Sequence, residues 1–432
     1  MKKKTMWVLV VSALSMVLFL SGCSSSEKSG GQSGDKTIKL MWWGSKDRND
    51  MTSKAIKQFE KENPNINVTP QFSGWDGYWS KLSTQVGGGT IPDVIQMDKK
   101  YLRNYATRGV LKDLSGLDIN FDALDSGSVN SGKINEELYG IPTGVNAITL
   151  IYDPAMLKKA GITIDSEKSM SWTDYANIAE KISKNLPDTY GTQNEMGWMA
   201  LFKFYARDHG EHLYIEGENS VKLGFSKQTM TDWFNYWLDL QEEGVAPPAE
   251  YTASFNWGEI EKFPIVKKKT PFSFAFSNQY PTIEKFANRD LKMAMSPSLN
   301  NGNKPYFLKP SMYWSISKDT KHPKASAKLV NYLLNSSKAV EIIGTDRGVP
   351  INTSFRKELT KSATGAKKEV ISFVNHVGEV AGDAPPVDAS SAGQLVDLLN
   401  DISQKVQFKQ LSPKEATNQF FDKAKSALSE DH

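Results

Sequence analysis

The sequence predicts an α/β protein folded as two lobes, and three observations support this fold class. Residues 37–98 alternate strand-like and helix-like segments, which is the order of a parallel sheet covered by helices. Residues 37–432 are too many for one hydrophobic core and enough for two. Polar and aromatic side chains follow each of the first three strand-like segments. Because ligands of parallel sheets bind beyond the carboxyl ends of the strands, the predicted site lies at that edge.

Residues 1–22 are predicted to form a secretory signal peptide. Three lysines precede an apolar run over residues 6–20, which is too short to span a bilayer comfortably. The Leu-Ser-Gly-Cys that ends at Cys23 resembles the bacterial lipobox, in which the signal is cut before a cysteine that then carries lipid. Cys23 is the single cysteine of the chain, so an intramolecular disulfide is excluded. The alternatives are a single transmembrane anchor and an ordinary signal peptide with a chance cysteine.

Residues 23–36 are rich in glycine and serine and are expected to form a flexible tether that holds a folded body off a membrane surface. Residues 1–22 hold three lysines and no acidic residue, so the rest of the chain has 49 basic and 49 acidic side chains. This balance gives no electrostatic reason to expect nucleic-acid binding.

The first predicted sheet is built from three strands with two helices between them. Residues 37–44, Thr-Ile-Lys-Leu-Met-Trp-Trp-Gly, are typical of a buried strand that ends in two tryptophans. An amphipathic helix is expected over residues 47–63, followed by a strand at 66–70. A second helix opens at Trp75. After a glycine-rich loop, a buried strand at residues 93–98 ends on a carboxylate.

Residues 139–144, Tyr-Gly-Ile-Pro-Thr-Gly, predict a turn that leads into a buried strand at 147–152. Residues 229–243 carry apolar side chains at helical spacing, which predicts a core face, so Trp233 and Trp237 are left out of the site. The other expected elements are a helix at 172–184, a strand at 272–276, a strand at 313–317, a helix at 322–334, and a helical remainder interrupted at 382–386.

Several short strings resemble a known family. Ile-Pro-Asp-Val at 91–94, Leu-Tyr-Gly-Ile-Pro at 138–142 and Leu-Ile-Tyr-Asp at 150–153 resemble the family 1 extracellular solute-binding proteins, the sugar receptors of bacterial ABC importers. The resemblance covers essentially the whole chain after the signal peptide. Four strings resemble more closely the lipoproteins that capture rhamnogalacturonan (pectin-derived) oligosaccharides: Asp-Val-Ile-Gln-Met-Asp at 93–98, Ser-Asn-Gln-Tyr at 277–280, Leu-Lys-Pro-Ser-Met at 308–312 and Arg-Gly-Val-Pro at 347–350.

The resemblance implies a two-lobed periplasmic-binding-protein fold with a ligand cleft between lobes joined by hinge crossings. The first crossing would lie at residues 140–152, the second at 291–297 and the third after the helix at 322–334. The N-terminal lobe would comprise residues 37–145 and 297–335, and the C-terminal lobe residues 146–296 and 336–432. The family's activity implies a monomer on the extracytoplasmic face of the cell membrane, anchored by lipid on Cys23, that delivers an oligosaccharide to ABC permease subunits. It implies no cofactor, no metal and no nucleic acid.

Sugar sites combine flat aromatic rings, which cover the C–H faces of pyranoses, with polar groups that hydrogen-bond the hydroxyls. The candidate ring platforms are Trp42, Trp43, Trp75, Trp257 and Trp314. The candidate polar partners are Asp76, Asp98, Asn146, Asn278 and Arg347, while Tyr101 and Tyr280 could serve either purpose.

Each candidate has a structural alternative. One of the adjacent Trp42 and Trp43 side chains should point inward, and we expect Trp43 to face the sugar. Asp76 could instead cap a helix, and Arg347 could form an ion pair between lobes. Only one of Tyr313 and Trp314 can face the cleft, because neighbours on a strand point to opposite faces.

Catalysis is poorly supported by the sequence. His209 and His212 have the spacing of two metal ligands on one helix face, but their surroundings offer no convincing third ligand. The chain has no Gly-x-Ser-x-Gly, no phosphate loop and no cysteine nucleophile. Asp76 and Asp98 could lie near each other as the carboxylate pair of a glycosidase, so hydrolysis is not excluded.

Two functions from other classes remain as alternatives to the sugar receptor. A surface enzyme that degrades polysaccharide could use the paired carboxylates. A receptor for a cationic solute such as a polyamine could use the same aromatic rings and carboxylates through cation–π attraction. An acidic, pectin-type ligand would instead favour a cationic partner such as Arg347 or Lys309.

Overall fold

The computed structural model describes residues 36–216, 221–255, 259–386, 388–389 and 391–429. The expected signal peptide, lipid site, tether and Trp257 lie outside these residues, and of Asp76 only the backbone is described. The chain divides into two units, residues 1–34 and 35–432, and both lobes belong to the second unit.

The first lobe is built around a five-stranded sheet of order β2-β1-β3-β14-β6. β1 (Lys36–Trp43), β2 (Ile66–Ser73) and β3 (Val94–Met97) are parallel, as the sequence predicts. β14 (Tyr313–Ile316) returns from the second lobe to pair antiparallel with β3, and β6 (Ile141–Pro142) pairs with β14.

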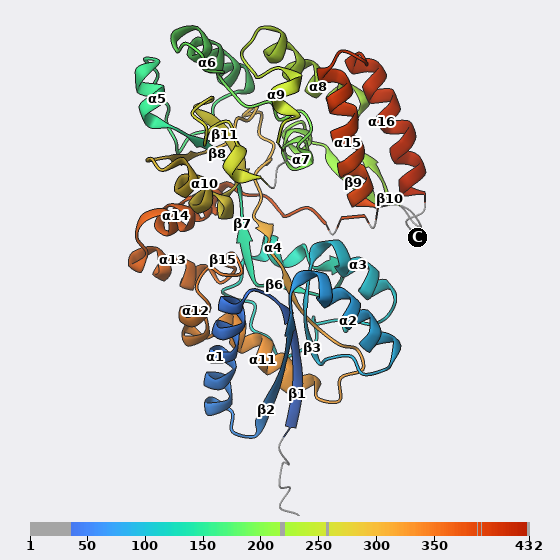
Figure 1. Ribbon diagram of the computed structural model, residues 1–432. Coiled ribbons are helices and arrows are strands. Elements are labelled where there is room, and N and C mark those ends of the chain that lie inside the picture. The colour runs from blue at the N-terminus through green and yellow to red at the C-terminus, as the bar shows by residue number, and fades with distance from the viewer. Residues whose placement is uncertain (1–35, 217–220, 256–258, 387, 390, 430–432) are drawn as a thin grey trace, which may run out of the picture. The chain divides into compact units, whose positions relative to one another are not determined.

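Alternate residues of β1 enter two different cores. Leu40 and Trp42 pack in a cluster with residues of α1 (Lys46–Glu62) and α11 (Pro323–Asn335). Met41 and Trp43 pack in another cluster with residues of α2 (Trp75–Gly87) and α3 (Lys99–Thr107). Figure 1 shows α1 and the α2–α3 pair on opposite sides of the strands. Both faces of β1 are therefore covered, as expected of a strand inside a parallel sheet.

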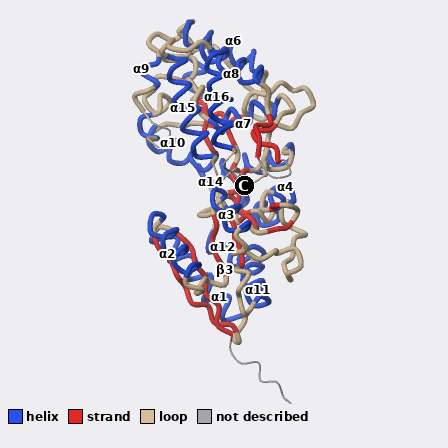
Figure 2. The backbone as a smooth tube through the Cα atoms, turned by 90° about the vertical axis from the view of Figure 1, so that its right-hand side faces the viewer, coloured by secondary structure: helices blue, strands red, loops and turns tan. Residues whose placement is uncertain are grey.

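The second lobe has a three-stranded sheet with β8 (Ile148–Tyr152) at its centre. β11 (Phe272–Phe276) and β12 (Lys292–Ala294) pair antiparallel with its two sides. This lobe is largely helical (Figure 2). Its helices are α5 (Pro154–Lys159), α6 (Trp172–Asn185), α7 (Met199–Asp208), α8 (Lys227–Glu242), α9 (Ala249–Thr252), α10 (Tyr280–Ala287), α15 (Ala392–Gln407) and α16 (Pro413–Leu428). Trp233 and Trp237 of α8 are fully buried, so the predicted core face is confirmed.

Three strands cross between the lobes and pair with one another. β7 (Gly144–Asn146) lies between β13 (Lys309–Pro310) and β15 (Val349–Pro350), both antiparallel to it. The second crossing predicted at residues 291–297 is wrong. β12 completes the sheet of the second lobe instead, and the chain crosses later, at β13.

The third crossing also comes later than the predicted lobe boundary. α12 (Ser337–Ile343) packs against α1 and α11, so the first lobe continues past residue 335 and the chain crosses at β15. α13 (Thr353–Ser362) and α14 (Gly365–Val380) follow. The short remaining elements are α4 (Ser126–Asn130), β4 (Lys133–Ile134), β5 (Glu137–Leu138), β9 (His212–Glu216), β10 (Val221–Gly224) and 3-10 helices at Ile260–Lys262 and Ser277–Gln279.

The connection between α14 and α15, residues 381–391, contacts both lobes through its described residues; we call it the α14–α15 connection. The backbone N–H of Gly382 donates to the carbonyl of Tyr306 in the second lobe. The N–H of Ala384 donates to the carbonyl of Gly127, in α4 of the first lobe. Within the described ranges, no helix has the length and apolar character needed to cross a membrane.

Candidate ligand-binding site

The carboxyl end of β3 leads directly into α3 and delivers two charged side chains to the edge of the sheet. Asp98 caps α3, because its carboxylate accepts a hydrogen bond of 2.8 Å from the backbone N–H of Lys100. Lys99 is then the first residue of the helix. Burial raises the pKa of Asp98 above its ordinary value. The sequence predicts Asp98 at this edge, and the structure places it there.

The second lobe and a crossing strand bring further groups to Lys99. Lys203 projects from α7, Phe276 ends β11, and Lys309 lies on the crossing strand β13. These residues line a cavity of about 260 Å³, which we call the lysine pocket. Its full lining is Lys99, Gly197, Trp198, Met199, Ala200, Lys203, Phe276, Phe307, Lys309, Asp388, Val396 and Asn400.

The charges of the lysine pocket meet at Asp388, in the α14–α15 connection. Its carboxylate lies 2.7 Å from Nζ of Lys203 and 3.6 Å from Nζ of Lys99. Burial alone would raise the pKa of Asp388, but the charges of Lys203 and Lys99 outweigh it and hold the pKa well below its ordinary value. Burial lowers the pKa of Lys99 to about 8 and also lowers that of Lys309. Three lysines around one lining carboxylate leave the pocket cationic.

This pocket suits an acidic sugar. Ammonium groups bind carboxylates by charge-assisted hydrogen bonds. Nζ of Lys309 lies 4.9 Å from the centre of the Phe276 ring, so cation and aromatic face stand side by side. Trp198 and Phe307 add further rings, and Asn400 adds an amide that can bond a hydroxyl.

Two predicted polar residues, Asn146 and Asn278, are neighbours of residues that line the lysine pocket. Asn146 is on β7, directly opposite Lys309 in the strand register. Its Oδ1 is buried and has no hydrogen-bond partner among the described residues. Asn278 follows the end of β11, two residues after Phe276, and is exposed. Both remain candidates for hydroxyl contacts.

Four predicted or neighbouring rings form an aromatic cluster in the first lobe. Trp43 meets Trp75 edge to face, with ring centres 5.1 Å apart. Tyr101 stacks on Trp79 at 3.9 Å and 32°. Trp75 is 42% exposed, whereas Trp43 is only 8% exposed. The exposed ring of the cluster is therefore Trp75. The expectation that Trp43 faces the sugar is corrected, because the rings around it cover it.

Three other predicted platforms are buried. Trp42 donates from Nε1 to Oδ1 of Asn49 at 2.8 Å, which agrees with the expectation that it points inward. Trp314 is 1% exposed, and Tyr280 donates its hydroxyl to the carbonyl of Leu291. The expectation that Trp314 and Tyr280 line the cleft is corrected, because both rings are buried in the core and leave no face exposed to a ligand.

Arg347 is also buried, within the first lobe. Its guanidinium donates to Oε1 of Gln96 and Oγ1 of Thr52, each at 2.9 Å, and lies over the Trp314 ring. Burial lowers its pKa to about 9. Its carboxylate partner is the adjacent Asp346, at 3.7 Å, so this ion pair lies within one lobe and not between lobes.

Sequence reasoning missed Lys99, Lys203, Trp198 and Asp388. The sequence contained a signal for Lys99, since this residue directly follows Asp98 at the end of a predicted strand. Lys203 and Asp388 had none, because residues so far apart in sequence meet only in the folded chain.

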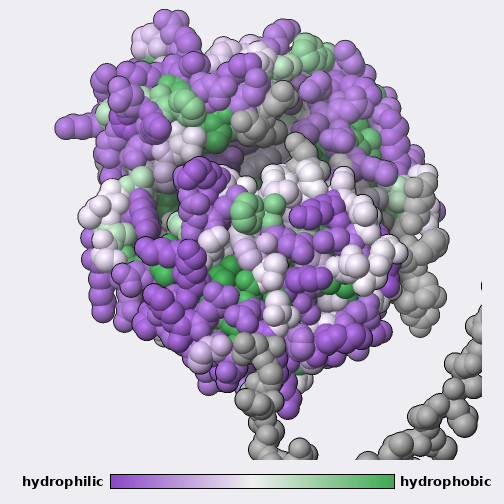
Figure 3. Space-filling view, turned by 60° about the horizontal axis from the view of Figure 1, so that its bottom comes forward, coloured by the Kyte–Doolittle hydropathy of each residue, from purple (hydrophilic) through white to green (hydrophobic). Residues whose placement is uncertain are grey.

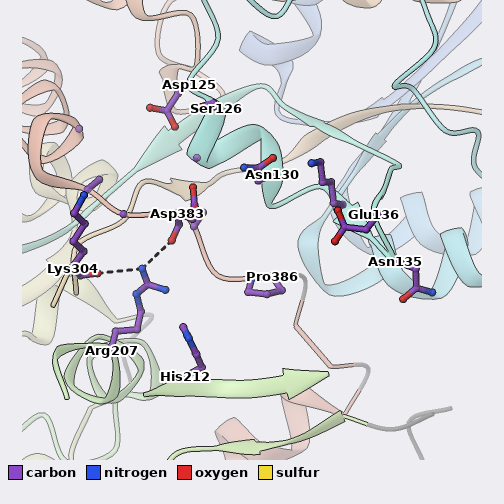
Figure 4. Close-up of a pocket in the computed structure, with 16 residues that line it drawn as sticks. Asp125, Ser126, Asn130, Asn135, Glu136, Arg207, His212, Lys304, Asp383 and Pro386 are labelled. Carbon is purple, nitrogen blue, oxygen red and sulfur yellow. Dashed lines mark hydrogen bonds between the residues drawn. The ribbon is translucent and has the colours of Figure 1, made fainter. Parts of the chain in front are cut away.

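A second hollow, of about 900 Å³, is lined in part by Asp383 and Pro386 of the α14–α15 connection (Figure 4). Asp125, Ser126 and Asn130 reach it from the α4 side, and His212 from β9. Arg207 donates to the carbonyls of Lys304 and Asp383. Its lining has no tryptophan, tyrosine or phenylalanine, and its lysines and arginine are matched by carboxylates. It therefore lacks the stacking surface of a sugar site.

The helical spacing of His209 and His212 does not place the two residues on one helix face. His212 begins β9, while His209 follows α7 and bonds the carbonyl of Tyr205 through Nδ1. No group of three metal-ligating side chains is placed to hold an ion in the part of the chain that the structure describes.

The protein surface in Figure 3 is largely hydrophilic and is hollowed in the upper middle of that view.

The electrostatics of Lys99 predict a pH-dependent affinity for acidic ligands. With a pKa of about 8, Lys99 is charged at pH 7 and becomes neutral as the pH rises to about 9.5. Affinity for a dicarboxylate sugar should therefore fall several-fold over that interval, as measured by isothermal titration calorimetry. A neutral disaccharide, and the Lys99→Met variant with the acidic sugar, should show no such fall. A flat profile in the native protein would contradict the role of Lys99.

Comparison with known proteins identifies the family of this chain. The model of the bacterial extracellular solute-binding proteins matches residues 54–368. A solved family 1 extracellular solute-binding protein from Alicyclobacillus acidocaldarius is 32% identical, with a TM-score of 0.80 over 91% of this chain and 99% of that one. A periplasmic oligogalacturonide-binding protein from Yersinia enterocolitica is 25% identical, with a TM-score of 0.81 over 91% and 99%. The galactooligosaccharide-binding protein of Bacillus subtilis is 22% identical over 100% of this chain and 99% of its own. The chain belongs to the bacterial extracellular solute-binding proteins.

Proposed function

We propose that this protein is the lipid-anchored solute-binding component of an ABC transporter, which captures an acidic oligosaccharide of plant cell-wall (pectin) origin and delivers it to the membrane permease. The lysine pocket carries the proposal, since it gathers three ammonium groups and aromatic rings where the two lobes meet. The protein changes no bond of its ligand.

The charge of the pocket distinguishes this function from its rivals. Three lysines repel a polyamine, so the pocket disfavours a cationic solute. A glycosidase needs two carboxylates across the scissile bond, and the pocket lining offers one, Asp388, held between lysines. The oligogalacturonide-binding relative supports a uronate-containing ligand.

Capture works by closure of the lobes. The pocket wall includes Lys99 from the first lobe, Lys203 from the second and Lys309 from a crossing strand. A ligand that contacts both lobes at once stabilises the closed arrangement relative to the open one. The crossing strands β7, β13 and β15 are the hinge about which this motion occurs.

A binding panel tests the function directly. In isothermal titration calorimetry with protein from Lys36 onward, digalacturonate should bind at least about tenfold more tightly than a neutral disaccharide of the same size. Its affinity should fall with added salt, since salt screens the attraction between the anionic ligand in solution and the cationic pocket. Equal binding of acidic and neutral sugars would overturn the acidic specificity. Cleavage of the sugar on long incubation, detected by mass spectrometry, would favour the enzyme alternative.

The membrane anchor is tested by a single substitution. Cys23→Ser should abolish incorporation of a palmitate analogue in cells of the source bacterium and release the protein into the medium. Ser24→Ala is the matched control and should leave both lipidation and membrane association intact. Continued lipid incorporation in Cys23→Ser would place the anchor elsewhere.

A further inference from the structure

The Asp388 carboxylate lies between two lysines that line the lysine pocket. It is shared between a lysine of the first lobe, Lys99, and one of the second, Lys203, at 3.6 and 2.7 Å. Its side chain is 27% exposed, so it can be reached from solvent. The ammonium group of Lys309 adds a third positive charge near Asp388. The carboxylate of the nearby Asp98 caps α3.

The backbone that carries Asp388 is held by contacts from both lobes. Nζ of Lys99 donates to the carbonyl of Pro385, and Arg207 donates to that of Asp383 at 2.9 Å. The N–H of Ala384 donates to Gly127 of the first lobe. The carboxylate is thus delivered to the lysines by a segment that spans the two lobes.

A uronate has the same functional group as Asp388. Two carboxylates cannot share one set of ammonium groups without strong mutual repulsion. Asp388 already occupies Lys99 and Lys203, so a ligand carboxylate that takes these two ammonium groups must replace the Asp388 carboxylate.

We propose that Asp388 is the internal occupant of a carboxylate subsite formed by Lys99, Lys203 and Lys309, and that the carboxylate of an acidic ligand displaces it on binding. The inference rests on the proposed function and assigns Asp388 as a specificity-determining residue. Ligands without a carboxylate cannot replace it and leave the lysines paired with Asp388. Displacement also releases the α14–α15 connection from Lys99 and Lys203, so that ligand charge is coupled to the contacts between lobes.

Removing the charge of Asp388 tests the exchange. In Asp388→Asn, digalacturonate should bind about tenfold more tightly than in the native protein, because the internal competitor is gone, while a neutral disaccharide is unaffected. Asp383→Asn is the matched control: it removes one negative charge from the same connection, at a residue that lines the other hollow. The control should change affinity less than about twofold. Unchanged or weaker binding of digalacturonate by Asp388→Asn would overturn the inference.

A second measurement separates this inference from the proposed function. If the native protein binds no acidic oligosaccharide, the proposed function fails, yet the subsite can still be tested with acetate. At constant ionic strength, replacing chloride by acetate should raise the melting temperature of Asp388→Asn more than that of Asp383→Asn, since acetate binds the vacated lysines in the native state. Equal shifts in the two variants would show that Asp388 fills no carboxylate subsite.

Discussion

Lys309→Met weakens binding of digalacturonate by about ten- to one-hundredfold, because a hydrogen bond to a charged group contributes roughly 1.5–3 kcal/mol. Lys309 lies on a crossing strand, with its ammonium over the Phe276 ring inside the lysine pocket. Methionine keeps the length of the side chain and removes the charge. The loss should therefore appear in affinity for acidic sugars, measured by isothermal titration calorimetry, and not in stability.

Lys304→Met is the matched control for Lys309→Met. Lys304 precedes β13 by five residues and lines the neighbouring hollow rather than the lysine pocket. Its replacement should change digalacturonate affinity less than threefold. A neutral disaccharide should bind both variants like the native protein. Equal losses for acidic and neutral ligands in Lys309→Met would mean that the side chain supports the pocket's shape rather than its charge.

Trp42→Ala lowers the free energy of unfolding by about 3–5 kcal/mol, the usual cost of removing a large buried aromatic side chain. Trp42 has no exposed surface and packs between the first sheet and the helices α1 and α11. Its ring lies 5.1 Å from that of Phe72, and the substitution also leaves Oδ1 of Asn49 without its indole donor. Urea unfolding followed by far-ultraviolet circular dichroism measures the change.

Trp75→Ala provides the comparison at a tryptophan on the same sheet edge. Trp75 is 42% exposed and touches the aromatic cluster mainly by ring edges. We expect Trp75→Ala to lower the free energy of unfolding by about 1 kcal/mol, since removing a partly exposed ring loses less buried apolar area. If ligand binding uses this ring, Trp75→Ala weakens sugar affinity while Trp42→Ala does not. A larger stability loss for Trp75→Ala than for Trp42→Ala would contradict the packing described above.

Local patterns were sufficient to predict much of the fold. The alternation of apolar strands with amphipathic helices located β1, β2 and β3 and their shared carboxyl edge, because both patterns arise from the fixed geometry of neighbouring residues. The helical spacing of tryptophans in α8 predicted their burial for the same reason. The crossings were harder. Residues 292–294 are strand-like in either lobe, and only pairing with β8 assigns them to the second.

The sequence by itself determined the α/β class, the position of Asp98 at a strand end and the resemblance to solute-binding proteins. Tertiary structure decided which rings are buried. Period-two alternation shows that neighbours face opposite sides, but Trp43 and Trp314 are covered by helices that come from elsewhere in the chain. It also assembled the site, because Lys99, Lys203, Lys309 and Asp388 meet from four separate segments. No local pattern encodes such a meeting, since it depends on how two lobes and their crossing strands pack together.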